Sequence, residues 1–233
     1  MALLHTACVA RIPCEVPPYA LSGTLYGTLL NHRSALDAVA AEAARPPYNA
    51  LPRAPVLYLK PRNTLAADGA PVELPQGVTE LEAAACLGIV VGRSARRLTE
   101  AAALDCVAGF LIVNDVSVPH SSYFRPAVRH QARDGFCPLG PRVTPRASVS
   151  NPDALVLRTY VDGVLAQSAS MADLVRPLAR LLADVTEFMT LAPGDVLAAG
   201  AAAPAPRVRA GQRVRIEAQE LGVLANSFVE NGA

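Results

Sequence analysis

Eight short apolar runs, rich in Val, Ile, Leu, Tyr and Phe, set the strongest limit on how this chain can fold. Each run has six to ten residues and is followed by turn-forming residues, a pattern typical of β-strands. The Asp162-Gly163 pair is a strong signal for a tight β-hairpin. The predicted strands cover residues 24–30, 55–60, 86–92, 109–118, 154–163, 195–200, 213–219 and 222–230.

Helical periodicity is confined to three segments. We predict a helix at 34–44 with Ser34 as N-cap, a second at 99–107 with Thr99 as N-cap, and a third at 174–191 with Pro177 in its first turn. The strands and helices do not alternate regularly. The sequence therefore favours a mixed β fold, a β-rich α+β class with a few peripheral helices, over a doubly wound sheet.

Alternation within the strands and spacing within the helices also predict which side chains form the core. Replacing a central member such as Ile112 by Asp is expected to unfold the domain. The predicted core is Leu29, Val56, Tyr58, Leu87, Ile89, Val91, Phe110, Ile112, Leu155, Leu157, Leu182, Phe188 and Val196.

Composition excludes several classes of protein. The chain is 52% hydrophobic and has a formal net charge of +1 with scattered basic residues, so we expect neither a nucleic-acid partner nor a membrane partner. No apolar run approaches the roughly 18 residues of a membrane span, and the N-terminus lacks a basic targeting segment. The five cysteines form no C-x-x-C pair, which favours a reducing, cytoplasmic location.

Motifs along the chain resemble those of the fumarylacetoacetate hydrolase family. They are LNHRSALDA, YLKPRNTL, GIVVGR, AGFLIVNDVSVP, YFRPAV, RDGFCPLGPRV and EFMTLAPGDVLAAG, in that order. The resemblance implies a β-sandwich or roll with peripheral helices. It divides the chain into an N-terminal extension, residues 1–22, and a family domain, residues 23–233.

Within the family, the motifs are most similar to the N-terminal half of the bifunctional isomerase/decarboxylases of 4-hydroxyphenylacetate (homoprotocatechuate) degradation. This resemblance implies a small dicarboxylate or tricarboxylate oxo-acid as ligand, and a homo-oligomer or a hetero-oligomer with a paralogous subunit. Active members hold Mg²⁺, Mn²⁺ or Ca²⁺ with three carboxylates, which suits hard cations. Two of the ligands form a Glu-x-Glu on one strand face, because residues i and i+2 point the same way.

The resemblance assigns the three ligand positions to Ala84, Cys86 and Asp115. Alanine offers no lone pair, and a thiolate is a soft donor that suits zinc or copper. We therefore expect this chain to bind no metal, since Asp115 is the only retained ligand. A nearby Glu80-Leu81-Glu82 lies four residues upstream of the assigned pair, about 13 Å along a strand, and solvated carboxylates are its simplest reading.

Other catalytic positions of the family are also replaced. A Lys, an Arg and a loop Thr correspond to Gln131, Pro119 and Ala201, and a His-x-x-Glu dyad corresponds to Ala35 and Ala38. No catalytic residue is assigned. These replacements favour a subunit that has lost most metal and catalytic positions and supports a metal-bearing paralogue.

Five charged positions match the family and are candidates for binding the substrate carboxylates. Guanidinium groups match carboxylates with two parallel hydrogen bonds. The alternative reading is structural: Arg133 and Asp134 form an ion pair that braces a loop, and Lys60 opens a turn. The candidates are Lys60, Arg62, Arg125, Arg133 and Asp134.

A second hypothesis is an independently active decarboxylase or isomerase of an unsaturated oxo-acid. It would use an unrecognised arrangement, such as Glu80, Glu82 and Asp115 around a metal, or Lys60 as a Schiff base or cationic electron sink. The remaining reactive side chains suggest little chemistry. His32 and His120 are expected to be surface residues, and Ser121-Ser122 lacks a nucleophile elbow. Cys86 and Cys137 are expected to pack in the core.

Overall fold

The computed structural model describes residues 23–120 and 127–232. The predicted extension 1–22, Arg125 and Ser121-Ser122 therefore lie outside the described residues. The helices are α1 (Arg33–Ala43), α2 (Glu100–Ala103), α3 (Val128–Gln131) and α4 (Leu178–Phe188). The strands are β1 (Leu25–Leu29), β2 (Val56–Lys60), β3 (Leu65–Ala66), β4 (Val72–Leu74), β5 (Leu81–Val91), β6 (Val107–Ser117), β7 (Cys137–Pro138), β8 (Thr144–Pro145), β9 (Val156–Val161), β10 (Val164–Ser170), β11 (Val196–Ala198), β12 (Arg207–Val208), β13 (Arg213–Ala218) and β14 (Gly222–Glu230).

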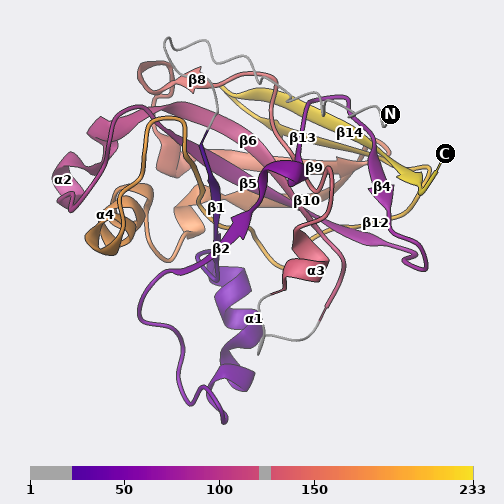
Figure 1. Ribbon diagram of the computed structural model, residues 1–233, viewed down its shortest axis with the longest axis horizontal. Helices are drawn as coiled ribbons and strands as arrows, with labels where there is room; N and C mark the ends of the chain where they lie inside the picture. Colours follow the sequence, from indigo (N-terminus) through magenta and orange to yellow (C-terminus); the bar gives the residue numbers. More distant parts are fainter. Residues whose placement is uncertain (1–22, 121–126, 233) are drawn as a thin grey trace, which may run out of the picture.

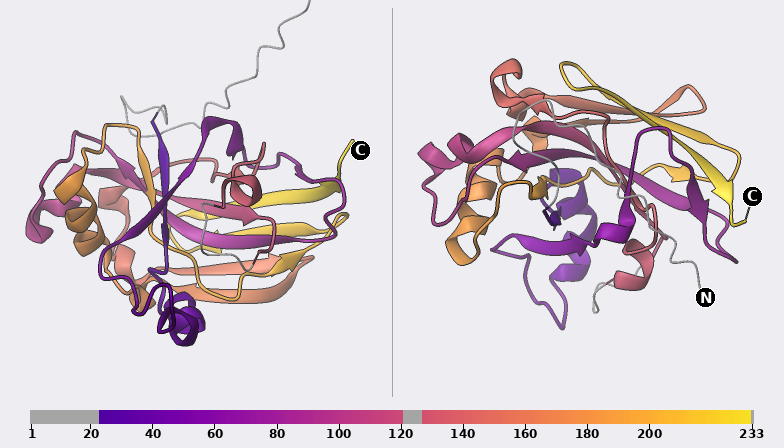
Figure 2. Two further views of the ribbon diagram at one scale, coloured as in Figure 1. Left: turned by 60° about the horizontal axis from the view of Figure 1, so that its bottom comes forward. Right: turned by 45° about the horizontal axis from the view of Figure 1, so that its top comes forward.

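Two sheets pack face to face and form the body of the molecule (Figure 1). The seven-stranded sheet has the order β2-β1-β11-β5-β6-β8, and β12 also pairs with β5. The five-stranded sheet has the order β10-β9-β13-β14-β4. The helices α2 and α4 lie together at one end of the sandwich, and α1 extends from the body on another side (Figures 1 and 2). This arrangement confirms the β-rich fold with peripheral helices.

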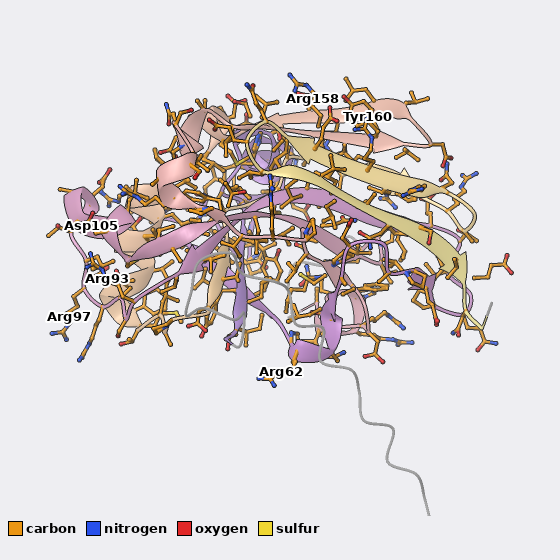
Figure 3. All side chains as sticks on the ribbon, turned by 90° about the horizontal axis from the view of Figure 1, so that it is seen from above. Arg62, Arg93, Arg97, Asp105, Arg158 and Tyr160 are labelled. Carbon is orange, nitrogen blue, oxygen red and sulfur yellow. The ribbon has the colours of Figure 1, made fainter. Side chains whose placement is uncertain are left out.

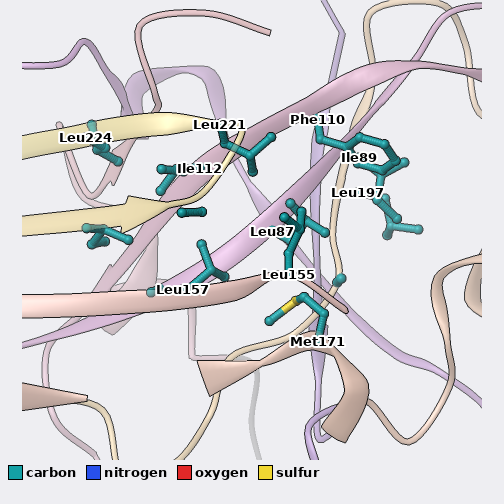
Figure 4. Close-up of a cluster of buried hydrophobic side chains, with 14 of the residues drawn as sticks. Leu87, Ile89, Phe110, Ile112, Leu155, Leu157, Met171, Leu197, Leu221 and Leu224 are labelled. Atoms are coloured by element: carbon teal, nitrogen blue, oxygen red, sulfur yellow. The ribbon is translucent and has the colours of Figure 1, made fainter. Parts of the chain in front are cut away.

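The main core fills the space between the two sheets (Figure 4). Strand alternation supplies it: Leu87 and Ile89 of β5 and Phe110 and Ile112 of β6 point to one face and are buried. On the opposite face of the same strands, Cys86, Val90, Leu111 and Val113 join a second, smaller cluster with Cys137 and Leu139. The seven-stranded sheet is therefore apolar on both faces, which explains its nearly continuous hydrophobic runs.

The helix α4 shows why a helical pattern was visible in the sequence. Its buried residues recur at helical spacing, and they are Leu178, Leu181, Leu182, Val185 and Thr186. The helix is shorter than predicted, because Pro177 is its N-cap and not part of its first turn. The helix at 99–107 is also shorter: α2 begins after Thr99 as predicted, but residues 104–106 form a 3₁₀ turn.

Two further expectations about local structure have clear outcomes. The Asp162-Gly163 hairpin is confirmed, because both residues have positive φ, 50° and 83°, and they join β9 to β10. The N-cap of α1 is His32 and not Ser34, since the imidazole accepts a hydrogen bond from the Ser34 N–H.

The strand predicted at 86–92 begins five residues earlier, at Leu81. Alanine has a low intrinsic preference for strands, so Ala83, Ala84 and Ala85 gave a weak signal. Pairing with β6 and β12 and burial between the sheets override that preference.

Most of the predicted core is buried, with four exceptions. Leu29 is 39% exposed because it ends β1 beside an edge strand, and Phe188 is 64% exposed on the outer side of α4. Val56 and Tyr58 are only half-buried, since β2 is that edge strand. Among the described residues, no helix has the length and apolar character needed to cross a membrane.

Candidate active site

Asp115 lies on β6 directly opposite Ala84 of β5. Cys86 follows two residues later on the same face of β5 and pairs with Val113. The fold thus brings the three assigned ligand positions onto one face of two adjacent strands, as alternation requires. Asp115 is the only one of the three that carries a carboxylate.

Lys60 places its ammonium group against this carboxylate. Its Nζ lies 2.6 Å from Asp115 Oδ1, and the Lys60 side chain is fully buried. The same Nζ donates to the carbonyl oxygens of Val116 at 2.7 Å, Phe136 at 2.9 Å and Gln131 at 3.0 Å. An ammonium group has three protons, so these four oxygens account for all of them.

Tyr58 satisfies the other oxygen of Asp115. Its hydroxyl donates to Asp115 Oδ2 in a short hydrogen bond. The ring lies across Gly27 of β1, where a Cβ would come within 2.0 Å of the ring. Burial, and then the negative charge of Asp115, raise the pKa of Tyr58 well above its ordinary value. The hydroxyl therefore remains a donor at neutral pH. Strand alternation predicted Tyr58 only as a core residue, and no local signal in the sequence indicates this contact.

These contacts also define the shape of the sheet. In strand order, β2 is separated from β6 by β1, β11 and β5, yet Tyr58 and Lys60 of β2 reach Asp115 of β6. The sheet is therefore strongly curled, with the second apolar cluster and Asp115 on its concave side.

The upstream carboxylates take part in a different cluster. Arg207 of β12 holds Glu80 with Nη1 and Glu82 with Nη2, each at 3.1 Å. Ser117 donates to Glu82 at 3.2 Å. Glu82 therefore belongs to the strand and is paired, which corrects the reading of both residues as solvated carboxylates before the strand.

One arrangement named for the second hypothesis places Glu80, Glu82 and Asp115 around one ion. Within residues 23–120 and 127–232, no group of three or more His, Cys, Asp or Glu side chains is arranged to hold a metal ion. The described residues therefore give no geometric support to this metal-based arrangement. The other form of the second hypothesis needs Lys60 as a free amine, but the Lys60 ammonium is buried against four oxygens.

Arg133 and Asp134, two of the described substrate-binding candidates, each contact another group. Arg133 donates through Nε to the Arg129 carbonyl at 2.9 Å, and Asp134 accepts from Asn63 Nδ2 at 2.7 Å. The described residues show no ion pair between Arg133 and Asp134, so the bracing ion pair was a wrong expectation. Arg62 is exposed at the periphery (Figure 3).

Burial opposes the charged forms of three remaining reactive groups, Cys86, Cys137 and His32. Burial raises the pKa of Cys86 well above its ordinary value and that of Cys137 to about 12, and both thiols pack in the smaller cluster as predicted. His32 is buried, contrary to expectation, and burial lowers its pKa. His120 stacks on His130 with ring centroids 4.9 Å apart.

Two other replaced positions, Gln131 and Ala201, lie beside the same site. The carbonyl oxygen of Gln131, the last residue of α3, accepts a hydrogen bond from Lys60, and Ala201 packs against the cluster that contains Cys86. Ala35 and Ala38 lie on α1, whose start is tied to the loop after β11 by a hydrogen bond from Ala203 N–H to Ser34 Oγ. These side chains lack the groups for proton transfer.

The residues present do not fit a resident Mg²⁺ or Mn²⁺. A hard cation requires several oxygen ligands. Here Asp115 faces Ala84, its two oxygens contact Tyr58 and Lys60, and the remaining ligand position is the thiol of Cys86, whose pKa is raised by burial.

Comparison with known proteins supports the fold and the family. Residues 24–229 match the family described as Fumarylacetoacetate (FAA) hydrolase C-terminal. The 4-hydroxyphenylacetate degradation bifunctional isomerase/decarboxylase of Salmonella dublin is 41% identical over 209 residues, covering 90% of this chain and 48% of that protein. The Escherichia coli enzyme of the same name is 39% identical over 210 residues, with the same coverage of both chains. The chain thus spans about half the length of these relatives.

Solved structures of related proteins have the same fold. The 5-carboxymethyl-2-hydroxymuconate delta-isomerase of Mycobacterium smegmatis superposes with a TM-score of 0.77 at 27% identity, covering 91% of this chain and 81% of that one. Maleylpyruvate hydrolase from Sphingobium sp. SYK-6, solved in complex with manganese(II) and pyruvate, gives 0.74 at 27% identity, covering 89% and 70%. The matched residues, the fold and the order of the motifs together place this chain in the fumarylacetoacetate hydrolase family.

Proposed function

We propose that this chain is a cytoplasmic subunit of an isomerase/decarboxylase system similar to that of 4-hydroxyphenylacetate catabolism. In this proposal the chain has lost the metal and most catalytic positions of its family and supports a metal-bearing paralogue. The observation that carries the proposal is the environment of Asp115, which faces Ala84 and is bonded through both oxygens to Tyr58 and Lys60.

The chemistry of this family explains why that environment matters. A bound divalent metal supplies a Lewis acid for a developing enolate. The protein's own residues at this site instead neutralise one carboxylate and hold β2 against β6. Lys60 is matched to the family, so the decisive change is the missing pair of carboxylates at Ala84 and Cys86.

The proposed ligand of the assembled system is a small dicarboxylate or tricarboxylate oxo-acid. The proposed oligomer is a homo-oligomer or a hetero-oligomer with the paralogue. The relatives named above support this ligand class, since one is an isomerase of a carboxymethyl-hydroxymuconate and another is solved with pyruvate. Neither nucleic acid nor a membrane is proposed as a partner.

Manganese binding by the purified chain tests the proposal. We expect the wild type to bind Mn²⁺ at least about 100-fold more weakly than the variant Ala84→Glu/Cys86→Glu, a difference of about 2.8 kcal/mol. The uncharged variant Ala84→Gln/Cys86→Gln is the matched control and should resemble the wild type. Titration can be followed by the electron paramagnetic resonance of free Mn²⁺.

Two outcomes would count against the proposal. The first is one tightly bound Mn²⁺ per wild-type chain that is lost in Asp115→Asn. The second is release of CO₂ from the oxo-tricarboxylate by the isolated chain that stops when EDTA is added, because this result favours an independently active enzyme.

A further inference from the structure

We infer that His32 is a proton-sensitive anchor, which fixes the start of helix α1 to the body of the domain at neutral pH and releases it in mild acid. The inference goes beyond the proposed function and does not depend on it. The evidence is the light packing of α1, the polar contacts at its first residues and the burial of the His32 ring.

Helix α1 is only lightly packed. All 11 of its side chains are exposed or half-buried, and Figure 1 shows the helix extending from the body of the molecule. An isolated helix of this length is marginal in water. The order of α1 therefore depends strongly on the contacts at its start.

Side-chain contacts fix the residues at that start. Asn31 Nδ2 donates to the carbonyl oxygen of Ala199 at 2.7 Å, and Asn31 Oδ1 accepts from the Arg176 N–H at 3.0 Å. Ser34 Oγ accepts from the Ala203 N–H at 3.0 Å. These contacts join the start of α1 to the loop after β11 and to the segment after β10.

His32 connects these contacts to the first turn of the helix. Its Nδ1 accepts from the Ser34 N–H at 3.4 Å and lies 2.9 Å from the Ser34 hydroxyl oxygen. Its carbonyl oxygen accepts from the N–H groups of Ala35 and Leu36, each at 3.0 Å. The capping bond requires a lone pair on Nδ1. The neutral ring, with its proton on Nε2, therefore completes the start of the helix.

A proton taken from solvent onto Nδ1 reverses this role. The imidazolium has only donors, so Nδ1 would point a proton at the Ser34 N–H. The ring would also carry a positive charge at the helix N-terminus, where the backbone N–H groups already carry partial positive charge. His32 is only 5% exposed, so water solvates that charge poorly while the ring stays in place. Protonation therefore favours a state in which the ring and the first turn leave the body.

The groups around the ring do not reverse this preference. Burial lowers the pKa of His32 and outweighs Asp173 and the backbone of Ser170, which both raise it. Arg176 is held in an ion pair, and residues 199–204 carry no charge. The charged side chains nearest in sequence to these contacts are Arg33 and Asp37 of α1, both exposed, and Asp173 and Arg176 after β10.

The anchor also borders the candidate site. Ser34 is bonded to Ala203, and Ala201, two residues earlier in the same loop, packs against the cluster that contains Cys86. Release of α1 therefore removes a contact from the loop that adjoins this site.

Amide hydrogen exchange of the full chain, followed residue by residue by NMR, tests the inference. We expect the protection factors of Ala35 and Leu36 to be about 10-fold lower at about pH 5 than at about pH 7.5. They should also be lower than those of α4 at both pH values, because α1 opens without the rest of the domain. In the same sample, the ring resonances of His32 give its titration midpoint, which should coincide with the loss of protection.

Two substitutions separate the proton from the cap. His32→Asn supplies a capping oxygen that does not titrate, so the protection factors of Ala35 and Leu36 should be equal at the two pH values. His130→Asn is the matched control, because the pKa of His130 is also lowered by burial but this residue lies on α3, and the pH dependence should persist. Circular dichroism at neutral pH verifies that both variants are folded.

Four results would each overturn the inference. They are equal protection of Ala35 and Leu36 at the two pH values in the wild type, pH dependence that persists in His32→Asn, loss of the pH dependence in His130→Asn, and protection in α1 as high as in α4. The last result would mean that α1 opens only when the whole domain unfolds. Exchange and ring titration of the wild type need no variant, so they decide the matter even if His32→Asn does not fold.

Discussion

Replacing Lys60 by Met should destabilise the fold more than any replacement of an exposed charge. The Lys60 ammonium lies 2.6 Å from Asp115 Oδ1 and is only 2% exposed as a residue. Coulomb's law gives about 6 kcal/mol of attraction at an effective dielectric constant near 20. Desolvation of both ions offsets much of this energy, so the net worth of the pair is smaller than the attraction.

The variant keeps the apolar stem but leaves the Asp115 carboxylate, which is only 13% exposed, without its cation. Removing one partner of a buried pair costs about 3–5 kcal/mol. Three carbonyl oxygens also lose their donor, those of Val116, Gln131 and Phe136. We therefore expect the free energy of unfolding to decrease by about 3–5 kcal/mol, which exceeds the 0.2–1 kcal/mol that is typical of exposed pairs.

Urea unfolding followed by circular dichroism measures this difference. Arg180→Met is the control, because Arg180 pairs with Asp184 and Glu100 while its side chain is 57% exposed. A double-mutant cycle adds Asp115→Asn, and the double variant should lose less than the sum of the single losses. A Lys60→Met variant within 1 kcal/mol of the wild type, or strictly additive losses, would refute the reasoning.

Three other predictions follow from burial. Ile112→Asp places a carboxyl group between the sheets and should lower the free energy of unfolding by about 5 kcal/mol or more. This variant should therefore show no cooperative thermal transition. The control Val223→Asp, on the exposed face, should fold normally. Burial lowers the pKa of His32, so below pH 6.5 the unfolded chain binds a proton that the folded chain excludes. The free energy of unfolding should therefore decrease as the pH falls below 6.5, and His32→Gln should reduce that slope in acid titrations. Burial raises the pKa of Cys137 to about 12 from 9.0, so above pH 9 the unfolded chain releases a proton that the folded chain retains. The free energy of unfolding should therefore fall by up to about 1.4 kcal/mol per pH unit above pH 9. If Cys137→Ala lost stability with pH at the same rate as the wild type, the assignment of this effect to Cys137 would be contradicted.

The sequence by itself determined the local structure and the family. Strands, the Asp162-Gly163 hairpin and the amphipathic pattern of α4 were visible because side-chain alternation, turn conformation and helical spacing depend on neighbouring residues. The motif order likewise identified the family and assigned Ala84, Cys86 and Asp115 to one site, and alternation then placed them on one face.

Only the tertiary structure decided which side chains surround Asp115. Tyr58 is 57 residues away in sequence, and it reaches Asp115 because the seven-stranded sheet curls until β2 approaches β6. The same long-range pairing extended β5 through the alanines and joined Glu80 and Glu82 to Arg207. Local preference carries no information about such partners, because sheet curvature and strand order arise from packing across the whole domain.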